Sequence, residues 1–400
     1  MKGVSVRGKL VHEIWGSDPS LYAPARYRRA CAYDIFIPDP IAGFDPLLEG
    51  TVSGIVSDAE KAITDLNQAG GPELDPLARL LLRTESIASS KVEGMQADAR
   101  SLARAEANQD TGRRVGSETA EILANIDAMQ LAIERAALTR ELAVDDIVAI
   151  HQVLLANAPN RDIAGRIRER QSWIGGNDYN PCDATFVPPP VNELDRLLQD
   201  LAIFCNDESL PPLVQAAIAH AQFETVHPFE DGNGRTGRAL VQVILRRRNL
   251  APSFVPPISV ILAREKDRYI RGLTLFREDH IADWIEIFAV AARRAADVAA
   301  RYKIRVAQLQ ESWRTSLRRA SNPRADAAAW AIIDILPAHP IVTVPVGVAA
   351  TGRTKPAVTN GVAELERAGV LARLTESARN RAWEAAGLLD LLVGLEAGDP

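Results

Sequence analysis

The sequence predicts a mainly α-helical protein with one small β-hairpin, followed by a C-terminal unit of mixed helices and strands. Apolar residues recur at helical spacing along most of the 400-residue chain. Strand-like runs fall near residues 33–38, 171–187 and 370–383. A Ser-Asn-Pro sequence at residues 321–323 separates the helical part from the unit behind it.

Composition narrows the class of protein. A hydrophobic content of 47% can fill the cores of two or three domains, and a net charge of −6 gives no general attraction to nucleic acid or anionic membranes. The three cysteines, Cys31, Cys182 and Cys205, are odd in number and are spaced unlike zinc ligands or a disulfide framework. Residues 1–15 lack a signal-peptide core, and no run of eighteen apolar residues follows. We expect a cytoplasmic protein without membrane contact.

The first half of the chain predicts scaffold helices. One amphipathic helix covers residues 49–67, and a second begins at residue 75 with an Asp-Pro start signal and ends in Ser-Ser-Lys-Val-Glu-Gly. Further helices cover residues 117–136 and 144–156. Residues 171–187 then predict a hairpin, whose edge either binds an extended peptide or simply covers the core.

The stretch from His227 to Arg238 lies between two strongly apolar helices. The helix of residues 211–226 must end at Pro228, which places His227 at a helix C-terminus. The helix of residues 236–248 is apolar on nearly every face, so we expect it to be buried with its first turn near Gly234. The connecting loop therefore leads into a helix N-terminus, where unpaired N–H groups and the helix dipole favour phosphate.

The side chains of this loop fit a bound nucleotide. Gly232 and Gly234 let backbone N–H groups approach phosphate, and Asn233 adds a side-chain donor. Arg235 and Arg238 lie on one face of the first turn and can hold phosphate oxygens.

Asp231 and His227 complete this chemistry. A single carboxylate beside phosphates is a typical Mg²⁺ ligand, and a histidine is a suitable general base. Together they favour attack of a hydroxyl on a nucleotide phosphorus. The structural alternative is a capped helix start with surface arginines.

The stretch from His227 to Arg238 resembles the signature of the Fic family, His-x-Phe-x-Asp/Glu-Gly-Asn-Gly-Arg-x-x-Arg. The resemblance implies an all-α Fic fold that transfers AMP from ATP to a Ser, Thr or Tyr hydroxyl of a target protein. It implies that His227 is the base and that Asp231 holds Mg²⁺, while Phe229 anchors the loop. It also implies that Asn233 and the glycine amides grip the phosphates, with the two arginines at the β- and γ-phosphates.

Residues 89–94 resemble the inhibitory motif that some Fic proteins carry upstream of the core, Ser/Thr-x-x-x-Glu-Gly/Asn. Without that context, a glutamate near a helix end is ordinary. The resemblance implies that Ser89 and Glu93 belong to an inhibitory helix, and that Glu93 pairs with Arg238 and obstructs the γ-phosphate.

Two further assignments rest on looser resemblance. Trp173, Ile174 and Gly175 are similar to the flap with which Fic proteins hold the target segment. Tyr269 matches one of two tyrosines that Fic proteins often carry beside the adenine.

Residues 323–400 resemble a winged helix-turn-helix. Three helices near residues 325–335, 344–350 and 356–368 precede a two-stranded wing, with Lys355, Thr359 and Asn360 at the start of the recognition helix. This region contains seven Arg and Lys and nine Asp and Glu, a net charge of −2. That charge argues against a general basic face for DNA. Protein contact or a dimer interface is the alternative.

We therefore predict three regions: an N-terminal region with the inhibitory helix (1–110), a Fic catalytic core (111–320) and a winged-helix domain (323–400). The predicted function is an autoinhibited, ATP- and Mg²⁺-dependent protein adenylyltransferase. The alternatives are an enzyme that removes AMP with the help of Glu93, and a DNA-binding regulator with a nucleotide-sensing core. Candidate partners are a target protein with an acceptor hydroxyl, the chain itself as acceptor, and a second copy of the chain.

Overall fold

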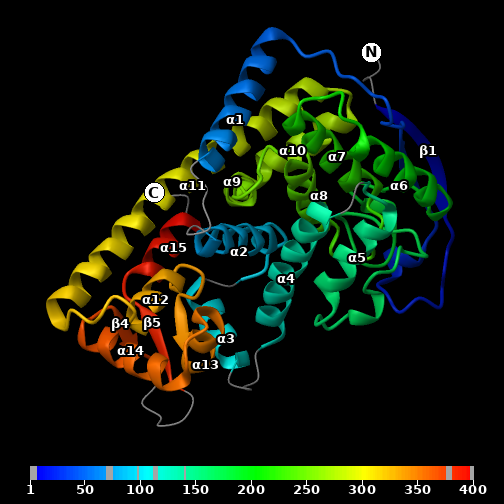
Figure 1. Ribbon diagram of the computed structural model, residues 1–400. Helices are drawn as coiled ribbons and strands as arrows, with labels where there is room; N and C mark the ends of the chain where they lie inside the picture. Colours follow the sequence, from blue (N-terminus) through cyan, green and yellow to red (C-terminus); the bar gives the residue numbers. More distant parts are fainter. Residues whose placement is uncertain are drawn as a thin grey trace.

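The computed structural model describes residues 7–68, 75–96, 99–110, 116–138, 141–374 and 381–396, and it is mainly helical (Figure 1). Its α-helices are α1 (Gly50–Gln68), α2 (Asp75–Val92), α3 (Ala99–Asp110), α4 (Ser117–Leu138), α5 (Val144–Leu155), α6 (Val191–Asn206), α7 (Pro212–Val226), α8 (Asn233–Arg247), α9 (Ile258–Arg264), α10 (Lys266–Arg277), α11 (Ile281–Ala320), α12 (Ala328–Ile335), α13 (Val344–Thr351), α14 (Lys355–Arg367) and α15 (Leu388–Glu396). Its strands are β1 (Gly8–Trp15), β2 (Cys31–Pro38), β3 (Ile341–Thr343), β4 (Leu371–Arg373) and β5 (Ala382–Ala385).

Helices α7 and α8 form the centre of the larger core. Leu213 to Val226 of α7 are all buried, and so are Asn233 to Leu245 of α8, which explains why both segments lack a polar face in the sequence. Helices α1, α4, α5, α6 and α11 pack around this pair. The loop between α7 and α8 therefore has a rigid support on both sides.

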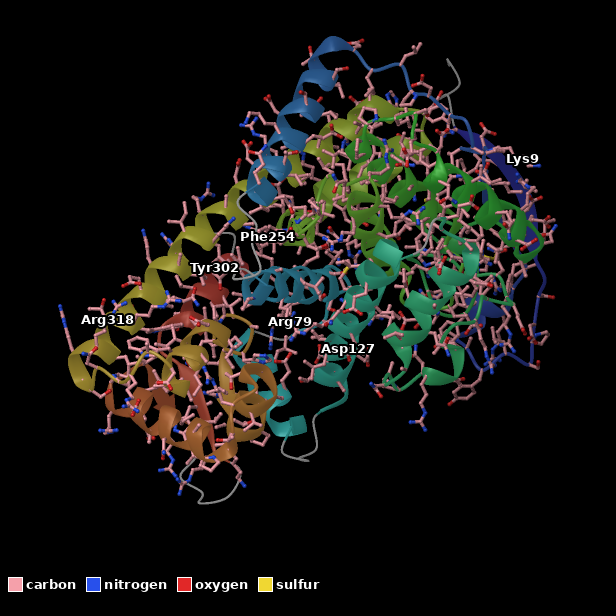
Figure 2. All side chains as sticks on the ribbon, in the orientation of Figure 1. Lys9, Arg79, Asp127, Phe254, Tyr302 and Arg318 are labelled. Atoms are coloured by element: carbon pink, nitrogen blue, oxygen red, sulfur yellow. A yellow bond between two sulfur atoms is a disulfide. The ribbon has the colours of Figure 1, made fainter. Side chains whose placement is uncertain are left out.

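Helix α11 spans 40 residues and joins the two largest hydrophobic clusters of the described chain. Its first half packs in the larger core, and its second half packs against the C-terminal elements. Phe254 and Tyr302, labelled in Figure 2, belong to the second cluster, to which α2 contributes Leu77, Leu80 and Leu81. The C-terminal elements are thus held by α11 and by the first half of α2.

The N-terminal residues form an antiparallel two-stranded sheet, in which Gly8 pairs with Pro38 and Trp15 with Cys31. The strand expected near residues 33–38 is confirmed as β2, whereas β1 has no counterpart among the predicted elements. Most β1 residues are exposed or half-buried, so its sequence lacks the apolar alternation that marks a strand.

The expectation that the cysteines do not pair is wrong. Cys31 at the start of β2 and Cys182 in the loop before residue 190 form a disulfide, with Cα atoms 5.9 Å apart. Their separation of 151 residues hid this pair, because only the fold brings the two segments together. Cys205 is a buried free thiol.

The predicted hairpin of residues 171–187 is reduced to one β-bridge between Ile174 and Phe186. The Ile174 N–H donates to the Phe186 carbonyl at 2.8 Å, and the Phe36 N–H of β2 donates to the Val187 carbonyl at 2.9 Å. This segment is therefore a loop laid against β2 rather than a free two-stranded ribbon.

Most predicted helices are confirmed within a few residues, including those of residues 49–67, 117–136 and 144–156. Helices α3 and α15 have no counterpart among the predicted elements. In the described ranges, no helix combines the length and apolar character that crossing a membrane requires.

Behind α11 the chain runs α12–β3–α13–α14–β4–β5–α15. The three short strands form an antiparallel sheet in the order β3-β5-β4. Helices α12 and α14 pack together, so closely that a Cβ at Gly361 would lie 2.8 Å from the Ala329 nitrogen. Figure 1 shows these elements gathered at the end of the molecule opposite α5, α6 and β1.

Candidate active site

The loop from His227 to Gly232 turns the chain from the end of α7 into the start of α8. His227 is the C-cap of α7 and has a left-handed backbone (φ 48°), and Gly232 precedes α8 with φ 76°. Left-handed conformations end one helix and orient the next, and glycine adopts them without strain. The predicted position of His227 at a helix C-terminus is confirmed.

Phe229 anchors the loop, as the resemblance implied. Its side chain is fully buried and stacks on His151 of α5, with ring centroids 3.7 Å apart and planes 7° apart. The Nε2 atom of His151 in turn lies 3.0 Å from the Asp231 carbonyl oxygen. The loop is therefore fixed at two points before α8 begins.

The side chain of Asn233 is hydrogen-bonded within the loop. Its Oδ1 accepts a hydrogen bond from the Phe229 N–H at 2.9 Å, and its Nδ2 donates to the Phe229 carbonyl at 2.8 Å. Both polar atoms of the side chain are thus used within the loop. The asparagine therefore closes the turn, and its expected contact with phosphate stays a prediction.

The backbone at the start of α8 fits the expected anion site. In the described part of the chain, no acceptor pairs with the backbone N–H groups of Asn233, Gly234 and Arg235. The first such bond of the helix runs from the Thr236 N–H to the Gly232 carbonyl at 3.0 Å. Three adjacent donors and the positive end of the helix dipole therefore point to the same place.

Glu93 lies directly at this place. A Cβ added to Gly234 would come within 1.9 Å of Glu93 Oε1, so only glycine leaves room for the carboxylate. Glu93 follows the end of α2, where Gly94 has φ 88° and the Met95 N–H returns to the Ser90 carbonyl at 3.2 Å. That left-handed glycine ends α2 and turns the chain away from the loop.

Arg238 connects α8 to α2. Its Nη2 donates to Glu93 Oε1 at 2.7 Å and to the Ser89 carbonyl at 2.8 Å, while its Nε donates to Ser89 Oγ at 2.9 Å. Arg238 and Ser89 are both buried. The contact expected between Glu93 and Arg238 is present, and Ser89 holds the guanidinium from the other side.

Mutual attraction sets the protonation states of Glu93 and Arg238. Burial alone would raise the pKa of Glu93, but the charge of Arg238 and its hydrogen bond outweigh burial, and the pKa is lowered. Burial works against the charge of Arg238 as well, yet the adjacent carboxylate of Glu93 raises its pKa. Both groups are therefore charged at neutral pH.

His227 is neutral at neutral pH. Burial, and then the charge of Arg168, lower its pKa to about 4, and its Nδ1 is buried without a partner in the described structure. Arg168 holds the loop through its Nε, which donates to the His227 carbonyl at 2.8 Å, and through its N–H, which donates to the Pro228 carbonyl at 2.9 Å. The role of Arg168 was not predicted, because nothing near residue 168 marks a contact with a loop 59 residues later.

The first arginine of the signature, Arg235, is oriented differently from Arg238. Arg235 is 1% exposed, and its Nη1 lies 3.8 Å from Glu121 Oε2 of α4, while its Nη2 lies 3.5 Å from Asp231 Oδ1. Its Nε is buried without a described partner. Arg235 and Arg238 thus flank the start of α8, and only Arg238 faces Glu93 directly.

Asp231 is exposed at the mouth of the loop, where its Oδ1 accepts from the Gly232 N–H at 2.6 Å and its Oδ2 from Asn160 Nδ2 at 2.9 Å. In the described ranges, no cluster of three His, Cys, Asp or Glu side chains could hold a metal ion. A Mg²⁺ ion bound through one carboxylate and substrate phosphates does not need such a cluster, and the exposed carboxylate beside the amide donors suits it.

Tyr269 is packed behind α8. It is 4% exposed, its hydroxyl lies 2.9 Å from His220 Nε2, and its ring packs against His220 and Trp284. The residue thus belongs to a buried aromatic cluster, and its expected contact with a nucleotide stays a prediction.

Two buried carboxyl groups near the site were not predicted. Burial raises the pKa of Glu224 in α7 to about 7, and its Oε1 lies 3.2 Å from the Cβ position of Gly237. Burial likewise raises the pKa of Glu85 in α2 to about 7, although Ser259 donates two hydrogen bonds to it. Their sequence signal is a glutamate on an otherwise apolar helix, which does not by itself distinguish a site from a packed polar group.

The candidate flap lies beside β1 and β2. Ile174 is 39% exposed and Gly175 has φ 75°. Trp173 is half-buried, packs edge-on against Trp15 at 5.9 Å, and donates from Nε1 to the Asn177 carbonyl at 2.6 Å. Of the three predicted flap residues, Ile174 is thus the one whose side chain is exposed.

These features describe a mainly helical protein in which three unpaired backbone N–H groups begin a buried helix, with a neutral histidine nearby and a glutamate against them. Residues 141–245 match the model of the Fic/DOC family, and residues 55–134 match that of the Fic/DOC family N-terminal region. The chain therefore carries a Fic/DOC domain, preceded by the N-terminal region of that family.

Curated proteins named protein adenylyltransferase are similar in sequence to parts of this chain. The chain is 38% identical over 119 residues to protein adenylyltransferase fic-1 of Caenorhabditis elegans, covering 29% of this chain and 22% of that protein. It is 27% identical over 212 residues to protein adenylyltransferase Fic of Drosophila willistoni, covering 51% and 39%. The chain thus spans less than half the length of these curated relatives.

Among solved structures, a Fic family protein from Desulfovibrio desulfuricans is similar with a TM-score of 0.52 and 21% identity, over 86% of this chain and 99% of that one. A Fic domain-containing signaling protein from Bacteroides thetaiotaomicron gives a TM-score of 0.50 and 19% identity, over 62% and 95%. These likenesses concern the fold.

Proposed function

We propose that this chain is a protein adenylyltransferase that transfers AMP from ATP to a hydroxyl group of a target protein, and that Glu93 inhibits it. The observation that carries the proposal is the unpaired N–H groups at the start of α8, flanked by Arg235, Arg238 and His227. Relatives named protein adenylyltransferase support the reaction type.

The triphosphate would bind where Glu93 now lies. Three backbone donors and Arg238 suit phosphate oxygens better than a single carboxylate, because phosphate offers more acceptors and more negative charge. While Glu93 holds Arg238, the terminal phosphate cannot reach that guanidinium. Inhibition is thus a competition between two anions for one arginine.

His227 would serve as the general base. Its imidazole is neutral, so it can take the proton of the acceptor hydroxyl as the hydroxyl oxygen forms a bond to the α-phosphorus. The bond from the α-phosphorus to the bridging oxygen of the β-phosphate breaks, and pyrophosphate leaves with the electron pair. Arg168 keeps the histidine in place through the backbone of residues 227 and 228.

Asp231 would hold Mg²⁺ at the mouth of the loop. Its carboxylate is fixed by the Gly232 N–H and by Asn160, so it is oriented before any metal arrives. When bound, the ion would neutralise charge on the phosphates. The target segment would lie along the exposed backbone near Ile174, where an extended peptide can pair with a short edge.

The test is the position of the transferred label. The purified protein with Mg²⁺ is incubated with ATP labelled at the α- or the γ-phosphate, with itself and a soluble protein extract as acceptors. We expect covalent α-label only, increased by Glu93→Gly and abolished when His227→Ala is added. Covalent γ-label, or no label with Glu93→Gly on either acceptor, would overturn the proposal.

A second reaction, removal of AMP from a modified protein, is favoured by one observation. The charge of Glu93 acts to raise the pKa of His227, so the site holds a second group that could accept a proton from water. If Glu93 takes part, Glu93→Gly increases labelling and stops AMP release from pre-modified protein. Release that continues in this variant excludes that role.

A further inference from the structure

The unit behind α11 carries an exposed basic surface, and we propose that this surface binds double-stranded DNA through α14. The elements α12, α13 and α14 with the sheet order β3-β5-β4 have the arrangement of a winged helix-turn-helix. The turn between α13 and α14 comprises Gly352, Arg353 and Thr354, and Gly352 has φ 65°. A three-residue turn with a left-handed glycine is typical of this motif.

Helix α14 has one buried and one exposed face. Val358, Gly361, Val362 and Leu365 are buried in the second cluster and against α12. Residues Lys355, Thr359, Ala363 and Arg367 follow each other at four-residue spacing and are all exposed. This exposed stripe has two cations, a hydroxyl and a small side chain, and it has no bulky apolar group, which suits a nucleic-acid groove better than an apolar protein interface.

The charge around this stripe is positive although the whole unit has a net charge of −2 over residues 323–400. The five cations Arg353, Lys355, Arg367, Arg373 and Arg381 are exposed. In the described part of the chain, none of these five forms an ion pair. They come from the turn before α14, from α14 itself, from the end of β4 and from the residue just before β5.

Four acidic residues of the unit are engaged in contacts, whereas Glu364 of α14 has a buried Oε2 without a partner in the described structure. Glu384 and Asp390 lie 3.4 and 2.7 Å from Arg100 of α3. Asp334 lies 2.8 Å from Arg314 of α11, and Glu366, beside the stripe, accepts a hydrogen bond from Trp383 Nε1 at 3.2 Å. Three anions of the unit therefore contact the helical part, while the five cations are exposed. Figure 1 shows α14 at the end of the molecule, away from α5 and α8.

This arrangement predicts how the surface would meet DNA. The residues at the start of a recognition helix contact base edges, so Thr359 and Asn360 lie where sequence would be read. The cations in the turn and on the strands would contact phosphates, which fix position and make binding salt-dependent. Binding does not require His227 or nucleotide transfer.

The experiment measures binding of the full chain to a fluorescent random-sequence 30-base-pair duplex across a range of salt concentrations. We expect binding at low salt that weakens steeply as salt increases. The double variant Arg353→Ala/Lys355→Ala should lower the salt slope by about two and weaken binding about tenfold. Arg324→Ala, an exposed arginine of the same unit outside the stripe, is the matched control and should leave both unchanged.

Two further variants separate the possible outcomes. After selection of preferred duplexes, Thr359→Ala/Asn360→Ala should reduce the preference over random DNA about tenfold, while random DNA still binds. His227→Ala should bind DNA like the wild type, so failure of the proposed transferase activity leaves this test intact. The proposal is overturned if the wild type does not bind the duplex at low salt, or if Arg324→Ala weakens binding equally. It is also overturned if the Arg353/Lys355 variant loses self-association in sedimentation and not DNA binding.

Discussion

Replacing Glu93 by glutamine should release Arg238 while preserving the shape of the side chain. The Arg238 Nη2 to Glu93 Oε1 distance of 2.7 Å is that of a charge-assisted hydrogen bond, which contributes about 1.5–3 kcal/mol. The Glu93 side chain is 38% exposed, so solvent screening reduces this to about 1–2 kcal/mol. Arg238 keeps both of its bonds to Ser89 in the variant.

Loss of this interaction, about 1–2 kcal/mol, should lower the stability of the protein and increase its activity. The free energy of unfolding in urea without nucleotide should fall by about that amount, and the competition with ATP should weaken by about 5- to 30-fold. Transfer of α-label from ATP should increase accordingly. Glu121→Gln is the control, because Glu121 lies 3.8 Å from the other signature arginine and accepts no hydrogen bond from it.

The pH dependence of the unfolding free energy independently tests whether the charged form of Glu93 stabilises the folded protein. The pKa of Glu93 is lowered in the folded protein, so the pair stabilises it fully above the unfolded value of about 4.3 and loses this effect as pH falls. The difference in unfolding free energy between wild type and Glu93→Gln should therefore disappear at acid pH. A Glu93→Gln protein that labels no faster than Glu121→Gln, with unchanged stability at pH 7, would refute the competition between carboxylate and phosphate.

Three other changes test the loop. Asn233→Ala should lower the free energy of unfolding by about 2–4 kcal/mol in urea denaturation, because it leaves the buried Phe229 N–H and carbonyl without partners; a loss below ~0.5 kcal/mol would contradict that role. Phe229→Ala should cost about 3–5 kcal/mol through the cavity against His151, and a thermal melt equal to that of the wild type would count against the anchor. Since burial and Arg168 lower the pKa of His227 to about 4, the pH–rate profile of labelling should show no inflection near pH 6.5, and should fall only as pH approaches the lowered value; an inflection near 6.5 that His227→Ala removes would show a solvated histidine instead.

Much of the site could be predicted because its residues are contiguous. The order of His227, Asp231, the two glycines and the arginines fixes a helix end, a turn and a helix start, and the structure confirms each of these positions. The pairing of Glu93 with Arg238 joins residues 145 apart, so local pattern could not show it and only the resemblance of residues 89–94 did.

The features that the sequence did not show have physical causes. The two hydrogen bonds of Asn233 to Phe229 depend on the shape of a buried turn, which the residue type alone does not reveal. The Cys31–Cys182 disulfide depends on the tertiary position of β2, and β1 is too exposed to show an apolar alternation. Tyr269 lies at helical spacing that suits either a core or a ligand, and the fold places it in the core.

Helix α2 has two attachments with different consequences for motion. Near its start, Leu77, Leu80 and Leu81 are inserted among the side chains of α11 and the C-terminal unit, while the chain just past its end carries Glu93 into the loop before α8. Sliding the whole helix would pull those leucines from their cluster and expose apolar area, at a cost far above that of one ion pair. The route with the smallest barrier is a side-chain rotation of Glu93, or an unwinding of the final turn between Ser90 and Gly94. An activating signal therefore only needs to act on a few residues beside Gly94, and the rest of the helix can stay where it is.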